Sequence, residues 1–231
     1  MNIFARTFRS FLNSRKLILV NSESFMRPWD LCAKLIAQGH NIEVVYDVGA
    51  HDGEWTKLLK SRTRNLKFYM FEPNSMYNCQ LLSSGEEFFN VLLSGKAENR
   101  DFYSLGKTSD SLFKPIGELY GGVKPTTMAS ETLDTFSLMN NLRPPDIIKF
   151  DTQGSELEIM QGGMKTIKQA IALIVEVSLL SSNIGGCRIG DIIDFLETLN
   201  FFPIALLDLH LDDRRYLHQI DLIFMQEKIK V

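Results

Sequence analysis

The sequence predicts an α/β fold with a mostly parallel sheet and helices on both of its faces. From residue 41 onwards, short apolar runs rich in β-branched and aromatic residues alternate with stretches that suit helices. Strands that are apolar almost throughout are buried on both sides, as in parallel sheets whose two faces are covered by helices. The chain has 231 residues, of which 45% are hydrophobic and 23% charged. This is enough for one large core without disulfides or metals.

The predicted elements follow one another as strand, turn and helix. Predicted strands cover residues 43–48, 66–71, 88–93, 146–150, 172–177, 201–207 and 220–225. Predicted helices cover residues 53–60, a stretch ending near residue 82, and residues 131–140, 155–170 and 189–199. The stretch 102–130 is rich in Gly and Pro and interrupts the alternation. A loop of this length in a compact domain is often a lid or a substrate loop.

The first forty residues have a different character. Six basic residues stand against two acidic ones there, and Phe4, Phe8 and Phe11 recur at helical spacing, which predicts a helix over residues 3–12. A second helix follows between Pro28 and Gly39. A basic amphipathic helix can contact an anionic membrane, but we favour packing against the flank of the domain. We therefore divide the chain into a basic N-terminal helical extension, residues 1–40, and a domain of residues 41–231.

Composition excludes several classes of protein. The formal charge of −3 offers no basic surface for nucleic acid. No apolar run reaches the roughly 18–20 residues that a membrane span needs. The cysteines are too far apart for a zinc ribbon or a CxxC redox pair, and a sparse, odd set of thiols indicates a reducing cytoplasm. They are Cys32, Cys79 and Cys187.

The turn after the first predicted strand, Asp47-Val-Gly-Ala-His-Asp-Gly53, has the features of a cofactor loop. Gly49 permits a tight turn, and Gly53 stands where the next helix begins with free N–H groups. A dinucleotide fingerprint would need a second glycine where His51 stands, and this side chain would obstruct a pyrophosphate. The alternative, acidic-x-Gly-x-x-x-Gly, is the form that class I methyltransferases use for S-adenosylmethionine. Asp47 would suit the positive charge of that ligand.

A carboxylate also ends the second predicted strand, in Phe71-Glu-Pro-Asn74. Glu72 in this position can accept hydrogen bonds from both hydroxyls of a ribose. Taken singly, Gly49 and Glu72 could be a turn glycine and a helix-capping carboxylate. Together, each at the carboxyl end of its own strand, they favour a nucleoside-type ligand at this edge of the sheet.

Three side chains are candidates for proton transfer. Asp151 follows the strand over 146–150 and should share the edge of Gly49 and Glu72. Glu176 lies inside an apolar strand, where a carboxylate is costly unless it is paired or belongs to a site; both explanations stay open. His210 is expected in a polar loop after the strand over 201–207, facing the acceptor. The sequence does not choose among these as general base.

A metal site was also considered in the polar stretch near His210. Asp208, Asp212 and Asp213 could join this histidine in holding a divalent ion. A solvated acidic loop is the commoner outcome, so we assign no metal.

From about Val44 to Met225 the chain resembles the FkbM family of S-adenosylmethionine-dependent methyltransferases. The resemblance rests on the turns at 47–53 and 71–74 and on five further segments. These are Glu131-Thr-Leu-Asp134, Ile148-Lys-Phe-Asp-Thr-Gln-Gly-Ser-Glu156, Met160-Gln-Gly-Gly163, Ile174-Val-Glu-Val177 and Gln219-Ile-Asp-Leu-Ile-Phe224. It implies a Rossmann-like sheet of about seven strands with an antiparallel last strand. It also implies O-methylation of a hydroxyl, often on a sugar, glycan or polyketide-like secondary-metabolite acceptor.

The expected site follows from these motifs. Candidate catalytic residues are Asp151, Glu176 and His210. Candidate cofactor contacts are Asp47, Gly49, Ala50, His51, Gly53, Glu72, Pro73, Ser94 and Asp151. The segment 109–112 resembles a family segment near the pocket. One departure is Gln153, where the family commonly has Glu; it favours a non-catalytic member that only binds the cofactor. A nicotinamide-dependent oxidoreductase is the other alternative.

Overall fold

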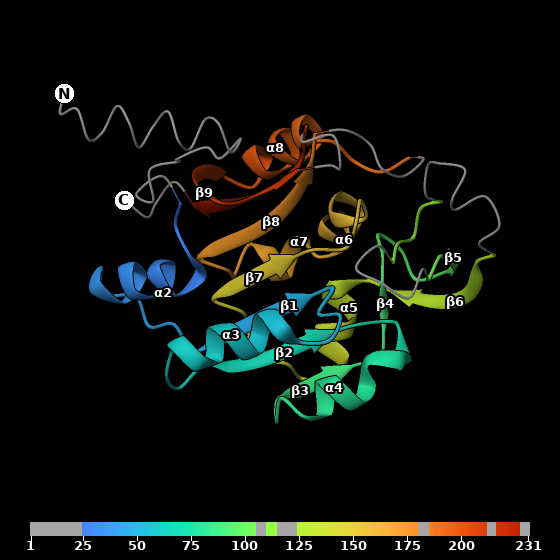
Figure 1. Ribbon diagram of the computed structural model, residues 1–231, viewed down its shortest axis with the longest axis horizontal. Coiled ribbons are helices and arrows are strands. Elements are labelled where there is room, and N and C mark those ends of the chain that lie inside the picture. The colour runs from blue at the N-terminus through green and yellow to red at the C-terminus, as the bar shows by residue number, and fades with distance from the viewer. Residues whose placement is uncertain (1–24, 105–109, 115–123, 180–184, 212–215, 227–231) are drawn as a thin grey trace, which may run out of the picture.

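The computed structural model describes residues 25–104, 110–114, 124–179, 185–211 and 216–226. Its centre is a seven-stranded sheet in the order β3-β2-β1-β7-β8-β10-β9 (Figure 1). The strands are β1 Val44–Val48, β2 Lys67–Phe71, β3 Glu87–Phe89, β7 Ile147–Phe150, β8 Ala172–Ser178, β9 Phe201–Leu211 and β10 Leu217–Gln226. Neighbours from β3 to β8 are parallel, whereas β10 is antiparallel to both β8 and β9. The predicted mostly parallel sheet with an antiparallel last strand is confirmed.

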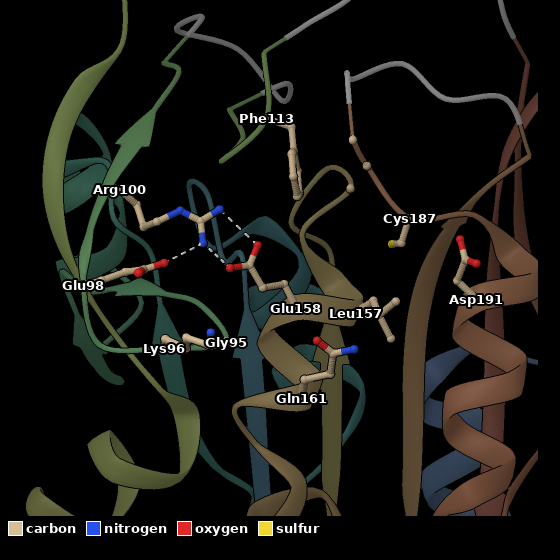
Figure 2. Close-up of a pocket in the computed structure, with 13 residues that line it drawn as sticks. Gly95, Lys96, Glu98, Arg100, Phe113, Leu157, Glu158, Gln161, Cys187 and Asp191 are labelled. Carbon is tan, nitrogen blue, oxygen red and sulfur yellow. Dashed lines mark hydrogen bonds and ion pairs between the residues drawn. The ribbon is translucent and has the colours of Figure 1, made fainter.

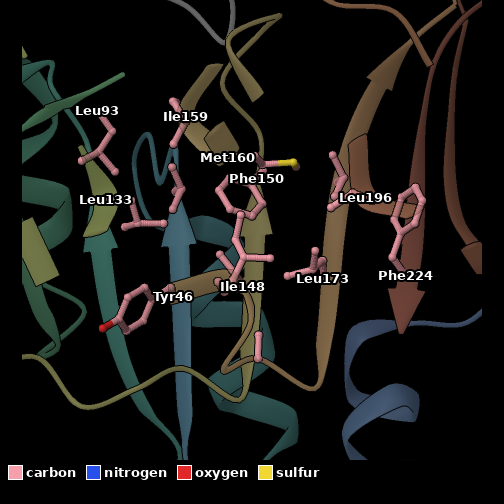
Figure 3. Close-up of a cluster of buried hydrophobic side chains, with 14 of the residues drawn as sticks. Tyr46, Leu93, Leu133, Ile148, Phe150, Ile159, Met160, Leu173, Leu196 and Phe224 are labelled. Atoms are coloured by element: carbon pink, nitrogen blue, oxygen red, sulfur yellow. The ribbon is translucent and has the colours of Figure 1, made fainter. Parts of the chain in front are cut away.

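Helices cover both faces, because the central strands are apolar on both sides. On one face, α5 Leu133–Met139, α6 Glu156–Gln161, α7 Met164–Ile167 and α8 Ile189–Thr198 pack against the larger core cluster (Figure 3). On the other face lie α2 Pro28–Ala37, α3 Glu54–Arg62, η2 Ser75–Tyr77 and α4 Asn78–Leu82. Every residue of β1 and of β7 is buried, which explains why periodicity alone could not distinguish one face of these strands from the other.

The strand predicted over residues 88–93 is two strands in two sheets. β3 ends at Phe89 and joins the main sheet, while β4 Leu92–Leu93 pairs with β6 Thr126–Glu131. β6 also pairs with β5 Asn99–Phe102, giving a small sheet of order β4-β6-β5. The chain passes from the main sheet to the small sheet at Asn90. Its side-chain amide donates to the carbonyl of Glu72 at 3.0 Å. The long predicted loop 102–130 therefore ends in a strand of this small sheet.

The helix predicted over residues 155–170 is broken at Gly162 and Gly163. A Cβ atom at Gly162 would lie 2.5 Å from the carbonyl oxygen of Ser94, so the small sheet approaches the helix backbone closely. The carboxylate of Asp134 accepts hydrogen bonds from the amides of Lys165 and Thr166 at 3.0 and 2.8 Å. It thereby satisfies free N–H groups at the start of α7.

The predicted helix between Pro28 and Gly39 forms as α2, and its Leu31, Cys32 and Leu35 are buried against the sheet. The helix predicted over residues 3–12 lies outside the described residues, so the boundary at residue 40 stays a prediction. None of the helices in the described part of the chain is long and apolar enough to cross a bilayer.

One strand extends further than predicted. β9 continues to Leu211, because it pairs with β10 along most of its length. His210 therefore lies in a strand and not in a polar loop, which corrects the expectation. Asp212 and Asp213 lie outside the described residues.

Candidate active site

A buried lysine links the ends of β1 and β7. The ammonium of Lys149 lies 3.0 Å from a carboxylate oxygen of Asp151 and 3.5 Å from one of Asp47. Burial lowers the pKa of Lys149, but the carboxylates of Asp151 and Asp47 raise it overall. The lysine is therefore charged, and it also lies 5.4 Å from the ring centre of Trp55.

Asp47, a candidate cofactor contact, is fully buried, and its contact with the cofactor stays a prediction. Its second carboxylate oxygen accepts a hydrogen bond from the hydroxyl of Thr56 at 2.7 Å. Burial raises the pKa of Asp47, and Lys149 opposes this rise. Asp47 thus holds Lys149 and the first helical turn of α3 in place.

The glycine turn, Asp47–Gly53, lies directly against the turn that follows the neighbouring strand β7. Gly49 has φ +82°, and a Cβ atom there would overlap the carbonyl oxygen of Asp151. Only glycine therefore allows the turns after β1 and β7 to touch. Gly53 also has a positive φ, +76°, and directly precedes α3. Ala50 is buried against α4.

His51 also has a positive φ, +50°, and its ring centre lies 4.0 Å from that of Tyr77. The Nε2 atom of His51 and the hydroxyl of Tyr77 are shielded from solvent without a hydrogen-bond partner within the described residues. Buried polar atoms are normally satisfied. These two groups therefore have unused hydrogen-bonding capacity next to the turn.

Glu72 is held at the tip of β2 by backbone amides. Its carboxylate accepts from the amide of His51 and from that of Asn74, beyond Pro73, each at 2.8 Å. Burial, with a smaller contribution from the carboxylate of Asp110, raises the pKa of Glu72 to about 7. Each oxygen still has a free lone pair for a ligand hydroxyl.

Beyond β7, glutamine side chains connect Asp151 and Glu176 with β10. The side-chain amide of Gln153 donates to Asp151 at 3.1 Å and to Glu176 at 2.7 Å. Gln219 on β10 donates to the same oxygen of Glu176 at 2.8 Å. Burial, then the charge of Asp151, raises the pKa of Glu176 well above its ordinary value. Glu176 is thus part of an internal network, in which its partners are amides and not a lysine or arginine.

Asp151 and His210 are the more accessible members of the group. The side chain of Asp151 is 34% exposed; burial raises its pKa, but Lys149 and Gln153 bring it below the ordinary value. The Nε2 atom of His210 lies 3.3 Å from a carboxylate oxygen of Asp221, and its side chain is 42% exposed. The hydrogen bond to Asp221 raises the pKa of His210.

Glu176, His210 and Asp221 also have the donor types that bind a divalent ion. One ligand atom from each lies within 4.8 Å of the others. Their present contacts are the two glutamine amides and the His210–Asp221 pair, so these contacts already account for the arrangement. Of the metal candidates considered from the sequence, His210 alone belongs to this group.

Ser94 is placed away from the glycine turn. It is fully buried, and its hydroxyl donates to the carbonyl of Lys96 at 3.1 Å and to Glu158 at 3.3 Å. It therefore ties the small sheet to α6. Its proposed contact with the cofactor stays a prediction.

Sequence reasoning missed Lys149, Gln219 and Asp221. Lys149 and Asp221 each interrupt an apolar strand, as Glu176 does, and the rule that flagged Glu176 also applies to them. Gln219 carries no such signal, because a glutamine before a strand is common on protein surfaces.

Comparisons with known proteins identify the family to which the sequence is similar. The methyltransferase FkbM domain matches residues 47–203. No curated protein matches the chain. A magnesium protoporphyrin IX methyltransferase from Synechocystis PCC 6803, solved with bound S-adenosylmethionine, is 11% identical; the match covers 85% of this chain and 76% of that one, with TM-score 0.46.

Two further solved structures show similarity of the same order. M. capricolum TrmK, in complex with S-adenosylhomocysteine, is 11% identical over 86% of this chain and 67% of its own, with TM-score 0.47. An S-adenosylmethionine-dependent methyltransferase from Clostridium acetobutylicum is 8% identical over 97% and 99%, with TM-score 0.45. These similarities are distant, and no substrate follows from them.

Proposed function

The chain belongs to the methyltransferase FkbM family, and we propose that it transfers a methyl group from S-adenosylmethionine to a hydroxyl of a sugar, glycan or secondary-metabolite acceptor. One observation carries the proposal. Glu72, Asp151 and His210, at the ends of the three strands β2, β7 and β9, lie along the same edge of the sheet. This is the edge at which open α/β sheets bind their ligands.

The residues around the glycine turn fit such a cofactor. The carboxylate of Glu72 has lone pairs for the two ribose hydroxyls. The orphaned Nε2 of His51 and hydroxyl of Tyr77 are free for polar atoms of the ligand. Asp151 offers a partly exposed carboxylate with a lowered pKa for the amino-acid ammonium or the acceptor hydroxyl. When bound, the cofactor would supply an activated methyl group on a sulfonium.

We assign the proton acceptor to His210 among the three candidates. Glu176 is a poor choice, because it is buried and two amides already occupy one of its oxygens. Asp151 is a weak base, because its pKa is lowered. His210 is accessible, and Asp221 strengthens it as a base. With the bound cofactor supplying the methyl group, His210 would accept the proton that the acceptor hydroxyl loses.

We propose the acceptor class and the cellular compartment from the composition of the chain. The chain carries no excess of positive charge, which favours a small molecule or glycan over nucleic acid. Its three cysteines are unpaired, which supports a reducing cytoplasm.

Calorimetric titration with S-adenosylhomocysteine tests the cofactor assignment. We expect saturable binding by the wild type, a loss of at least tenfold for Glu72→Ala and no change for Glu197→Ala, an exposed control on α8. Absence of binding by the folded wild type would refute the proposal.

Transfer of a radiolabelled methyl group tests the acceptor. A panel of saccharides, glycolipids and hydroxylated polyketides is incubated with enzyme and labelled cofactor, and the products are treated with alkali. A methyl ether survives this treatment, whereas a methyl ester is cleaved. Labelled products that are alkali-labile, or label found only on nitrogen, would contradict O-methylation.

A further inference from the structure

A cavity of about 640 Å³ lies beside the proposed active site, on the other side of the turn that follows β7 (Figure 2). The small sheet forms one wall of the cavity, and the start of α8 forms the opposite wall. α6 forms the floor, and Phe113 closes the top. A volume of this size suits a ligand of about the size of a disaccharide.

The cavity and the active site share one turn. Gly154 lines the cavity, while the preceding Gln153 sends its amide to Asp151 and Glu176. The carbonyl of Gln153 accepts from the hydroxyl of Ser111 at 2.8 Å, and this hydroxyl accepts from the amide of Phe113 at 3.1 Å. A molecule seated in the cavity would therefore touch the same turn that orients the reacting groups.

Three of the five charged side chains that line the cavity are paired with one another. The guanidinium of Arg100 binds both carboxylate oxygens of Glu158, one of them at 3.1 Å, and lies 3.4 Å from Glu98. The lining holds two cationic side chains against three carboxylates. Within the described residues the ammonium of Lys96 has no carboxylate at ion-pair distance, but the carboxylates of the lining outnumber its cations, so an anionic ligand would meet a net negative surface.

What remains is a fixed set of hydrogen-bonding groups next to apolar surface. The paired carboxylates keep lone pairs, and Gln161 points a side-chain amide into the cavity (Figure 2). Phe113 and Leu157 supply the apolar surface, and glycines leave room; a Cβ atom at Gly185 would lie 3.3 Å from the Phe113 ring. Many hydroxyls on an apolar ring skeleton match this surface.

We propose that this cavity binds a neutral saccharide unit of the acceptor, next to the unit that receives the methyl group. The inference rests on the proposed function, because it takes the saccharide to be part of the methyl acceptor. The binding of a neutral saccharide can be measured without any methyl transfer. Under this proposal, one set of residues recognises the acceptor and a different set carries out the reaction.

Saturation-transfer NMR tests this on the full chain in the presence and absence of S-adenosylhomocysteine. The probes are maltose, cellobiose, lactose and mannobiose, with glucuronic acid and glucose 6-phosphate as anionic comparators. Gln161→Trp fills the cavity from an exposed position on α6, and Gln169→Trp places the same residue at an exposed position away from it. Phe113→Ala removes the ring without filling the space.

We expect at least one neutral disaccharide to give signals in the wild type and in Gln169→Trp. These signals should fall at least fivefold in Gln161→Trp and in Phe113→Ala. Equal signals in Gln161→Trp, absence of signal from every neutral probe, or stronger signals from the anionic comparators would overturn the proposal. Calorimetry with S-adenosylhomocysteine on the same samples reports the cofactor site separately, so failure of the proposed function is not mistaken for failure of the cavity.

Discussion

The two sides of the candidate active site are held in place by different means. On the β1–β2 side, backbone amides fix Glu72, and the approach of one turn to another fixes Gly49. On the β7–β10 side, the glutamine side chains of residues 153 and 219 fix Glu176, and Asp221 pairs with His210. A contact to a backbone amide constrains the chain path, whereas a contact between side chains depends on each residue's identity.

The two kinds of contact suit two different parts of the reaction, the binding of the cofactor and the binding of the acceptor. A side bound by the main chain tolerates changes of most neighbouring side chains and suits a ligand that stays the same. A side bound by side chains can be altered one residue at a time, which suits differing acceptors. The buried Lys149 stands between the two and connects them through Asp47 and Asp151.

Replacing the connecting lysine should produce the largest effect. Lys149→Met leaves the buried carboxylate of Asp47 without its cation, and we expect a loss of about 3–5 kcal/mol in the free energy of unfolding. Because burial already raises the pKa of Asp47, the loss should shrink at acid pH, where this group can take up a proton. Urea denaturation at pH 8 and pH 5 measures both. Lys168→Met, at an exposed position, is the control; equal stability of the two variants would show that the sides are independent.

Replacing His210 tests whether the β7–β10 side carries out proton transfer. His210→Gln should lower kcat about 100-fold without changing the affinity for S-adenosylhomocysteine, and His218→Gln serves as the matched control. Because Asp221 raises the pKa of His210, activity of the wild type should fall as pH decreases through this raised value. Asp221→Asn should move the fall to lower pH. An unchanged pH profile in Asp221→Asn would contradict the assignment.

The same contrast explains which features were predictable from sequence. The turn at Asp47–Gly53 and the tip at Glu72 follow local rules about glycine and strand ends, so they were found. The contact of Asp47 with Lys149 was not predicted, because the two residues are remote in sequence and become neighbours only through strand pairing. His210 was misplaced because the length of β9 is set by pairing with β10 and not by its own residues. The break at Gly162 depends on Ser94 in another sheet.

Restoring the family's usual residue at position 153 tests how far side-chain identity matters. Gln153→Glu removes a donor to Asp151 and Glu176 and adds a third carboxylate, so we expect a loss of about 2 kcal/mol at pH 8. The new carboxyl should have a raised pKa, so its protonated form remains a donor at low pH. Stability should therefore be close to wild type at pH 5 and fall as pH rises. Gln169→Glu is the exposed control, and a pH-independent loss would refute this explanation.

The smallest expected effect concerns Glu72 on the β1–β2 side. With a pKa of about 7, its ionised fraction increases about tenfold between pH 6 and pH 8. Affinity for S-adenosylhomocysteine should rise by up to that factor, because ribose hydroxyls donate to the ionised form, and Glu72→Gln should abolish the rise.

Stability provides the check on that explanation. Since the folded-state pKa of Glu72 is raised, its protonated form stabilises the ligand-free protein at acid pH, and this contribution is lost as pH rises towards 7 and beyond. Glu72→Gln should lack this part of the pH dependence of unfolding. If the variant and the wild type lose stability in parallel from pH 5 to pH 8, burial does not control this group.

The hydroxyl of Ser111 anchors the inserted segment to the turn that carries Asp151, through the carbonyl of Gln153. The region from β5 to β6 can therefore be replaced as one piece by the corresponding region of another family member. A chimaera that imports residues 99–131 from another member would change the cavity wall while leaving the glycine turn untouched. It would need to keep a hydroxyl at position 111 for the imported wall to meet the reacting groups. This hydrogen bond and the pairing of Arg100 with Glu158 are therefore the contacts that an exchange of residues 99–131 would have to preserve.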